Sequence, residues 1–337
     1  MTGILLIDKP EGMTSFVAAA RVRRMTGVKK TGHTGTLDPM ATGVLPVLLG
    51  GATRFCELLP SHDKAYIASL RLGTVTDTLD ITGEVLETRE VNASRADFES
   101  ALQSFSGTIE QVPPMYSAIS QNGVRLYKLA RQGIEVERES RTVNISSISL
   151  VGCNEKNGEY TISVECSAGT YIRSLVADIG EKLGCGAVMT ALRRTKANGF
   201  PIDGCITLDE LAELAQSGKI EEKIIPIEQA LDSYRFVTVT EPQARRFKNG
   251  GELSLERLYL KAPQENELVR VIAPGNEFLG MGEVSDGEIK VKRLLIKTAN
   301  ESFTDPERIY SAGERHVSSA GDHQYPQRHA VSSAGVC

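Results

Sequence analysis

Apolar and polar residues alternate in several stretches of the chain, which is the pattern of half-buried β-strands. In residues 160–166 the even positions are Tyr, Ile, Val and Cys, and the odd ones are Thr, Ser and Glu. Residues 66–72 alternate in the same way. A sheet with one solvated face favours antiparallel pairing. The four apolar residues 4–7, closed by Asp8 and Lys9, predict a first strand.

Three segments instead space their apolar residues as an amphipathic helix does. The first follows Ser94, an N-cap candidate, with apolar residues at 98, 101, 102 and 105. Thr207 and Glu210 have capping-box spacing before a second helix, and a third stripe, at 175, 179 and 183, stops at Gly184. Strands and helices do not alternate regularly, so the fold class is α+β with a mostly antiparallel, mixed sheet.

The helical and strand signals predict three regions. Strand-like runs at 236–239, 268–272 and 289–291 follow a break near 232–240, which predicts a small β-rich domain. Beyond residue 298 apolar periodicity is lost, and V-S-S-A-G occurs twice, at 317–321 and 331–335. We therefore expect a large α+β domain over 1–232, large enough for an enzyme's catalytic domain, a small β-rich domain over 233–297 and a disordered tail over 298–337.

Composition and charge narrow the class of protein. The 337 residues carry a net charge of −5, no apolar run approaches about 18 residues, and no basic leader precedes the first strand. We expect no membrane span and no secretory signal. The six cysteines are scattered without a C-x-x-C pair, which favours reduced thiols in a cytoplasmic protein. Only His33 and His62 precede the predicted tail, so a histidine-rich metal site is not expected.

Residues 31–46 are too rich in Gly, Thr and Pro for a helix or a plain strand. Residues 27–34 resemble a phosphate-binding loop, but His33 stands where that loop needs lysine, and the segment before it is helix-like. Nucleotide hydrolysis is therefore disfavoured. Pro39 drives Asp38 toward extended geometry. On spacing alone Asp38 is also compatible with an ordinary Asp-Pro turn, and His33 with a loop histidine.

The motif G-H-T-G-T-L-D-P-M-A-T-G-V-L-P at residues 32–46 resembles the catalytic motif of the TruB family of tRNA pseudouridine synthases. Further segments agree with the family in the same order: 6–15, 64–66, 72–80, 113–118, 126–131, 169–173 and 192–194. The resemblance covers about residues 3–297. In the last part, 247–250 and 278–283 look like the small RNA-binding, PUA-like domain of bacterial members. One departure is Ser120, where many members carry lysine.

The resemblance implies the pseudouridine synthase fold and the isomerisation of uridine 55 in the T loop of tRNA, without a cofactor or a metal. Asp38 is then the nucleophile, acting at the ribose C1′. Arg173 matches the arginine that pairs with this aspartate, although a surface salt bridge is an alternative. Tyr66 matches the tyrosine that packs on uracil, although its place in an alternating strand also fits a core residue.

Five further residues are implied to bind substrate. His33 is expected to help fill the space that the flipped nucleotide leaves, and Tyr171 and Leu192 to line its pocket. Leu192 by itself also fits ordinary core packing. Lys64 and Lys9 lie in family motifs as well, with less defined roles.

An acidic protein needs segregated positive charge to bind RNA. Basic residues gather at 21–30, at 193–196 and at 290–297, and each cluster is also what a solvated face looks like. With few aromatic residues and no tryptophan, recognition of a folded tRNA T arm by shape is favoured over stacking of single strands. We expect a monomer that binds no nucleotide cofactor and no membrane. The alternatives are a tRNA-binding or tRNA-folding protein without turnover, and the same chemistry on another RNA.

Overall fold

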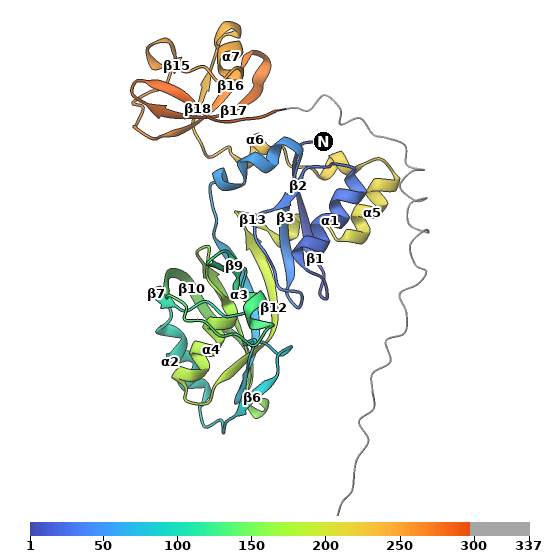
Figure 1. Cartoon of the computed structure of the whole chain (residues 1–337), viewed down its shortest axis with the longest axis vertical. Coiled ribbons are helices and arrows are strands. Elements are labelled where there is room, and N and C mark those ends of the chain that lie inside the picture. The colour runs from blue at the N-terminus through green and yellow to red at the C-terminus, as the bar shows by residue number, and fades with distance from the viewer. Residues whose placement is uncertain (297–337) are drawn as a thin grey trace, which may run out of the picture. The chain divides into compact units, whose positions relative to one another are not determined.

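A mixed sheet of nine strands forms the larger part of the computed structural model, which describes residues 1–296 (Figure 1). The predicted tail, 298–337, lies outside this range. The strands are β1 (Gly3–Lys9), β2 (Thr31–His33), β3 (Thr42–Leu49), β4 (Lys64–Leu72), β7 (Gly107–Gln111), β10 (Arg141–Asn154), β11 (Glu159–Cys166), β12 (Ala187–Ala197) and β13 (Phe200–Pro201).

The strand order is β1-β3-β12-β4-β11-β10-β7, with β2 added to β3 and β13 to β12. Only the β3–β12 pair in this sheet is parallel, and the other pairs are antiparallel. The predicted α+β class with a mostly antiparallel mixed sheet is therefore confirmed. The alternation predicted for residues 160–166 is also confirmed, because the apolar positions of β11 are buried and the polar ones are not.

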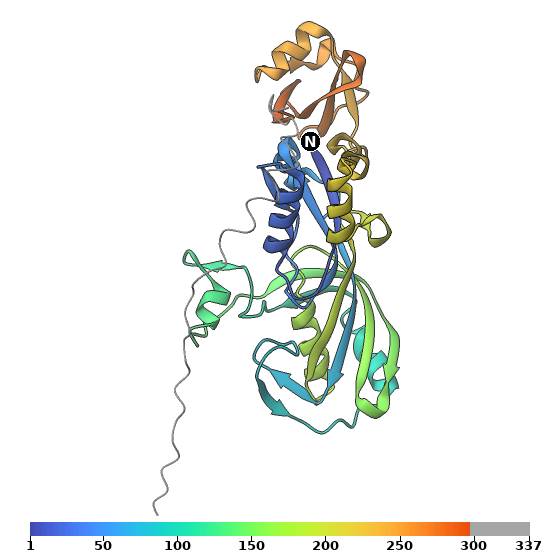
Figure 2. The same cartoon turned by 90° about the vertical axis from the view of Figure 1, so that its right-hand side faces the viewer.

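Helices cover the sheet at both of its ends (Figure 1, Figure 2). Over the whole described range, which includes the second sheet below, the helices are α1 (Ser15–Thr26), α2 (Arg95–Gln103), α3 (Leu126–Ala130), α4 (Ile172–Lys182), α5 (Leu208–Gln216), α6 (Ile227–Ala230) and α7 (Glu241–Lys248). The 3-10 helices are η1 (Gly50–Leu58), η2 (Glu155–Asn157), η3 (Ile202–Gly204), η4 (Ile220–Lys223), η5 (Leu255–Arg257) and η6 (Pro274–Asn276). Two short hairpins pair β5 (Thr74–Thr76) with β6 (Val85–Thr88) and β8 (Ser120–Gln121) with β9 (Val124–Arg125).

The three predicted helices are present as α2, α4 and α5. Ser94 caps α2 and forms a capping box with Asp97, and Thr207 does the same for α5 with Glu210. Phe98 of α2 is buried and stacks on Tyr160 of β11, with ring centroids 4.0 Å apart. Local capping and a long-range contact thus agree on the position of α2.

Strand β1 is buried on both faces, which explains its unbroken apolar run. Leu5 and Ile7 pack in a core with α1 and α5. Ile4 and Leu6 face the opposite side and pack with Phe55 of η1. Because β1 is held from two sides, the loop that follows it has a fixed starting point beside the site described below.

A second sheet of five strands has the order β14-β16-β17-β18-β15, and its core is drawn from residues 237–294. Its strands are β14 (Phe236–Thr238), β15 (Leu253–Ser254), β16 (Leu268–Ala273), β17 (Glu277–Ser285) and β18 (Glu288–Leu294). The three strand-like runs expected there are confirmed as β14, β16 and β18. The domain limits 1–232, 233–297 and 298–337 stay a prediction.

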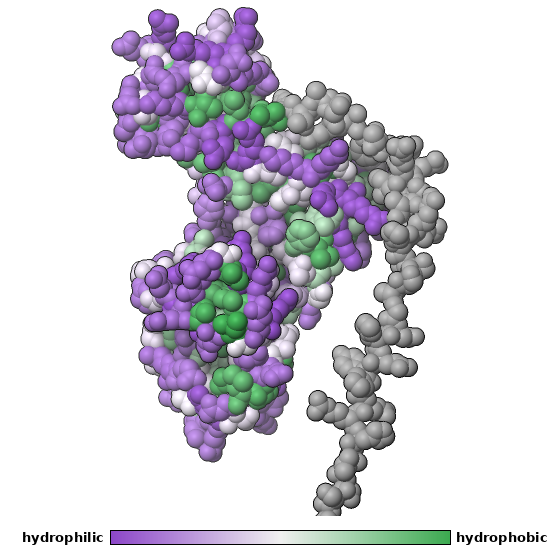
Figure 3. All heavy atoms as spheres, in the orientation of Figure 1, coloured by the Kyte–Doolittle hydropathy of each residue, from purple (hydrophilic) through white to green (hydrophobic). Residues whose placement is uncertain are grey.

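Hydrophilic residues cover most of the face seen in Figure 3, and apolar ones gather there in small patches. Among residues 1–296, no helix has the length and apolar character needed to cross a membrane. The five cysteines in the same range are free thiols.

Candidate active site

A cavity of about 750 Å³ opens between the long sheet, the loop before β3 and the start of α4. Six residues singled out from the sequence line it together: Asp38, Lys64, Tyr66, Tyr171, Arg173 and Leu192. They come from four separate segments, which the pairing of β4 with β12 and the packing of α4 on β12 bring together. Asp38 offers its carboxylate to the cavity, with 36% of its side chain exposed.

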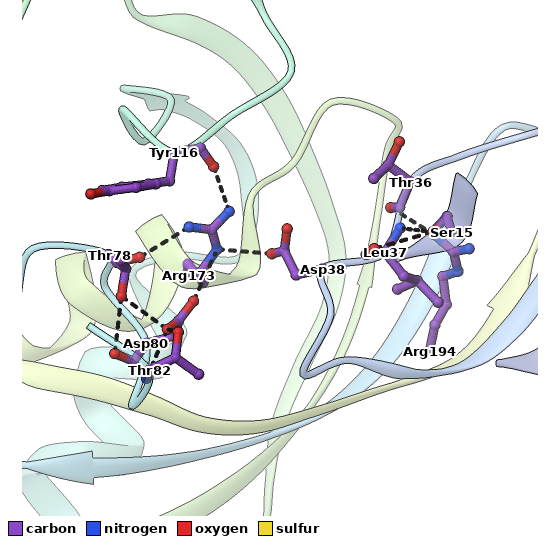
Figure 4. A network of polar contacts seen from close by, with 10 residues as sticks. All are labelled: Ser15, Thr36, Leu37, Asp38, Thr78, Asp80, Thr82, Tyr116, Arg173 and Arg194. Atoms are coloured by element: carbon purple, nitrogen blue, oxygen red, sulfur yellow. Dashed lines mark hydrogen bonds and ion pairs between the residues drawn. The ribbon is translucent and has the colours of Figure 1, made fainter. Parts of the chain in front are cut away.

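Asp38 forms an ion pair with Arg173, whose Nε lies 2.9 Å from Oδ2 of the carboxylate (Figure 4). Arg173 is buried and uses its other nitrogens on main-chain oxygens. Nη1 donates to the Thr78 carbonyl at 3.0 Å, and Nη2 donates to the Tyr116 carbonyl at 2.7 Å. These two bonds therefore hold the guanidinium in one orientation relative to Asp38. It holds one oxygen of Asp38 and leaves the other to face the cavity.

A second carboxylate, Asp80, faces the same guanidinium (Figure 4). Its Oδ2 lies 3.8 Å from Arg173 Nε, while Oδ1 accepts from the Thr78 and Thr82 hydroxyls at 2.9 and 2.5 Å. Asp80 lies in a segment that matches the family, but the sequence assigned it no role. The alternation Thr-x-Asp-x-Thr at 78–82 was the available signal, because two hydroxyls flanking an aspartate suit a tightly bonded turn.

The loop that carries Asp38, residues 34–41 between β2 and β3, is called the motif loop, and it is held by side chains from β1, α1 and β12. Ser15 Oγ accepts from the Leu37 amide at 2.7 Å and donates to the Leu37 carbonyl at 3.1 Å. Lys9 Nζ donates to the carbonyls of Met13 at 2.7 Å and of Pro39 at 3.4 Å. These contacts clamp the residues on either side of Asp38 and fix the direction of its side chain.

Arg194 is the third anchor, and its side chain is fully buried. Nε donates to the Val44 carbonyl at 2.7 Å, Nη2 to Gly35 at 3.2 Å and Nη1 to Thr36 at 3.4 Å. The sequence showed Arg194 as a member of a basic cluster and of the family segment 192–194, without a role of its own. Nothing local could reveal that it points inward, because its face depends on the register of β12 against β3 and β4.

Steric crowding explains why position 43 of the motif is a glycine. Its φ is 103°, and a Cβ there would lie 2.1 Å from the carbonyl oxygen of Arg194. Any larger residue would push β3 away from β12 at their parallel pairing, where Arg194 is in register with Gly43. The motif glycine thus keeps Arg194 and the loop that carries Asp38 at their close separation.

Tyr66 and Leu192 form an apolar wall of the cavity, and both are nearly buried. Burial raises the pKa of Tyr66 to about 12, and the nearby charge of Arg194 acts in the opposite direction. The phenol is therefore protonated at neutral pH. Tyr66 is thus a core residue of β4 that also lines the cavity, and its contact with uracil stays a prediction.

Lys64 and Tyr171 also line the cavity. Burial, followed by the charge of Arg194, lowers the pKa of Lys64, and burial raises the pKa of Tyr171. The main chain of Tyr171 is clamped by the buried side chain of Gln111, which accepts from its amide at 2.8 Å and donates to its carbonyl at 3.0 Å. This clamp positions the first turn of α4 and so Arg173.

Two residues expected to contact substrate do not line this cavity. Lys9 is buried among carbonyls, and burial lowers its pKa to about 8. His33 ends β2, is partly buried, and has its pKa lowered, mainly by burial. Ser120 lies exposed in β8. Within residues 1–296 no three side chains of His, Cys, Asp or Glu gather as they would around a metal ion.

Solved structures share this fold. A Cbf5-Nop10-Gar1 complex aligns with a TM-score of 0.66 at 25% identity, covering 87% of this chain and 85% of that one. The structure of an H/ACA RNP bound to a substrate RNA containing 2′-deoxyuridine aligns with a TM-score of 0.66 at 24% identity, covering 88% and 85%. Together with the matching family models, the fold and site define an enzyme of the pseudouridine synthase class.

Three family models match the chain: the N-terminal domain of TruB family pseudouridylate synthases at 23–172, the tRNA pseudouridylate synthase B C-terminal domain at 173–232, and the C-terminal domain of pseudouridine synthase II TruB at 236–295. tRNA pseudouridine synthase B of Clostridium perfringens strain 13 is 47% identical over 300 residues, covering 88% of this chain and all of the relative. Its counterpart in Pseudomonas putida strain F1 is 44% identical over 299 residues, covering 88% and 96%. The chain belongs to the TruB family of pseudouridylate synthases.

Proposed function

We propose that the protein isomerises uridine 55 in the T loop of tRNA to pseudouridine, with Asp38 as the nucleophile. The observation that carries this proposal is the Asp38–Arg173 pair at the cavity, where a fixed guanidinium holds one carboxylate oxygen and the other stays accessible. The names of the relatives support tRNA as the substrate.

The reaction needs the target base outside its stack, because C1′ and C5 cannot be reached inside a folded loop. A cavity of about 750 Å³ is within the range that holds small ligands, so it can take a flipped nucleotide. Tyr66 and Leu192 offer an apolar wall for the uracil face. Stacking there offsets part of the unstacking cost of a few kcal/mol.

In the proposed sequence an oxygen of Asp38 attacks C1′ and the C1′–N1 bond breaks, so uracil leaves with the bonding electron pair. The uracil turns within the cavity and C5 attacks C1′, which releases the Asp38 carboxylate. C5 then loses its proton and N1 gains one, so no atom or electron is gained or lost overall. Arg173 keeps the Asp38 carboxylate oriented through both displacements. Tyr66 lies beside the uracil, whose C5 loses a proton and whose N1 gains one.

The roles of the remaining residues follow from their places. Lys64 and Tyr171 contact the nucleotide from the rim of the cavity, while Lys9 and Arg194 position the loop that carries Asp38. His33, directly before the motif loop, helps to fill the space that the flipped nucleotide leaves in the T loop. We expect a cytoplasmic monomer that binds the T arm.

The test is incubation of the purified protein with an unmodified tRNA transcript, with EDTA and no added cofactor, followed by site-resolved mapping of pseudouridine. The proposal expects one modified position, the T-loop uridine. Modification at a different position would overturn the assignment to uridine 55. Tight tRNA binding with no pseudouridine would favour the alternative of a tRNA-binding or tRNA-folding protein.

A further inference from the structure

The surface of α1 and the turn after it carry an uncompensated positive charge. Five cationic residues lie there within ten positions: Arg21, Arg23, Arg24, Lys29 and Lys30. All five are exposed, and within residues 1–296 none has an ion pair or a side-chain hydrogen bond. In a chain with a net charge of −5, such a cluster concentrates positive potential on one face.

The other two basic clusters of the sequence are different. Lys290, Lys292 and Arg193 each form an ion pair with a carboxylate, at 2.7 or 2.8 Å. Arg194 is buried, and its side-chain donors bond to the Val44 carbonyl of β3 and to carbonyls of the motif loop. Of the three clusters, the one on α1 is therefore the most available to an external anion within the described part of the chain.

The exposed charges of α1 form one continuous face. At about 100° per residue, the exposed positions Phe16, Val17, Arg21, Arg23 and Arg24 fall within an arc of about 160°. The opposite side, with Ala18 and Val22, is buried against the β1–β3 core. A helix of 12 residues is about 18 Å long, so the face can follow several consecutive phosphates of an RNA strand.

This face begins at the cavity. Thr14, the N-cap of α1, lines the cavity, and Ser15 bonds the main chain of Leu37 beside Asp38. Phe16 follows them with 76% of its surface exposed. The first of these charges, Arg21, follows Ser15 by six residues, about 9 Å along the helix, so the charged face is placed to hold the strand on one side of the target nucleotide.

We propose that the exposed face of α1, continued by Lys29 and Lys30, binds the phosphate backbone of the substrate RNA beside the flipped nucleotide. The inference rests on the proposed function for its substrate. Cationic side chains gain affinity for RNA by releasing condensed counterions, so free charges contribute most. A membrane is a poorer partner, because apart from Phe16 and Val17 the apolar residues of α1 pack in the core and cannot enter a bilayer.

The test compares two variants of equal charge change. Arg21→Gln/Arg24→Gln removes two charges from α1, and Lys156→Gln/Lys182→Gln removes two exposed charges elsewhere, outside the cavity lining. Affinity for an unmodified tRNA transcript is measured between 50 and 200 mM salt. Each lost phosphate contact lowers the slope of log K against log salt by about 0.7 to 0.9. We expect a slope smaller by roughly 1.5 and a Kd about tenfold higher for the α1 variant only.

Separate measurement of KM and kcat distinguishes a role of this surface in RNA binding from a role in catalysis. The α1 variant is expected to raise KM about tenfold while turnover at saturating RNA stays within twofold, because Asp38 and its anchors are untouched. Equal thermal midpoints for the two variants would show that helix stability is not the cause. Equal salt slopes for both variants would overturn the proposal, as would an unchanged tRNA affinity with lost binding to phosphatidylserine vesicles.

The outcome is distinguishable from failure of the proposed function. If wild-type protein binds tRNA without forming pseudouridine, the salt slopes still report on the α1 face while the function is rejected. If wild-type protein modifies the T loop and the α1 variant binds and turns over normally, the function stands and the surface assignment is rejected.

Discussion

The Nε of Arg173 lies 2.9 Å from Oδ2 of Asp38, and the rest of the guanidinium is bonded to main-chain carbonyls of two different loops. The pair therefore joins α4 to the motif loop by a rigid contact. Its value lies in orientation, because a buried ion pair by itself adds little to stability.

Arg173→Lys tests this orientation. Lysine keeps the charge but cannot reach Asp38 and the carbonyls of Thr78 and Tyr116 together. We expect kcat to fall by about 10² or more, because misplacing a reacting group by about 1 Å has that cost. Single-turnover assays and tRNA affinity are the measurements. Wild-type turnover in this variant would show that charge alone is sufficient.

Arg194→Lys tests the anchor under the motif loop. Lysine cannot replace all three bonds, to the buried Val44 carbonyl and to the part-buried Gly35 and Thr36 carbonyls, and the loss of a buried bond costs about 1–3 kcal/mol of stability. We also expect kcat to fall about hundredfold with little change in KM, because Asp38 is displaced while the binding surface is kept. Arg193→Lys is the matched control, since Arg193 is the preceding residue of β12, is only partly buried and pairs with Asp8. Equal kcat in both variants would remove the positioning role.

Tyr66→Phe separates the ring from the hydroxyl. The ring remains in the cavity wall, so tRNA affinity is expected to stay within about threefold. Because the pKa of Tyr66 is raised to about 12, the neutral phenol is the form available for proton exchange at pH 7. We expect kcat to fall about hundredfold through loss of this group. Unchanged kcat would limit Tyr66 to stacking.

Lys9 predicts a pH dependence of stability. Its pKa is about 8 in the folded chain and 10.5 when unfolded, so between these values the unfolded state binds more protons and the free energy of unfolding rises with pH. The gain is about 2–3 kcal/mol between pH 8 and 10.5. Urea unfolding of the wild type relative to Lys9→Met should show this rise. A difference that is flat with pH would contradict it, and the exposed Lys182→Met is the control.

Elements set by local rules could be predicted from the sequence. The N-cap at Ser94, the capping box at Thr207 and the alternation of β11 need only neighbouring residues, and all three are present. Asp38, Tyr66 and Arg173 were selected through a motif resemblance, and they line one cavity although they are far apart in the chain. Their individual roles stay predictions.

What the sequence missed depends on long-range register. Arg194 and Gly43 matter to each other only because β12 pairs in parallel with β3 at that point. Asp80 becomes a partner of Arg173 only after α4 packs on the sheet. Lys9 lies in a family motif as a charged residue, yet the turn after β1 folds its amine under the motif loop. No local pattern encodes such distances.

The central claim is that Asp38 performs the chemistry, and Asp38→Asn tests it most directly. Asparagine is nearly isosteric, so tRNA affinity is expected to stay within about tenfold while turnover is lost. The measurement is site-resolved pseudouridine mapping of an unmodified tRNA transcript, with wild type and variant at equal fractions of bound tRNA. The account predicts modification of the T-loop uridine by the wild type and none by the variant. Comparable modification by Asp38→Asn would contradict it.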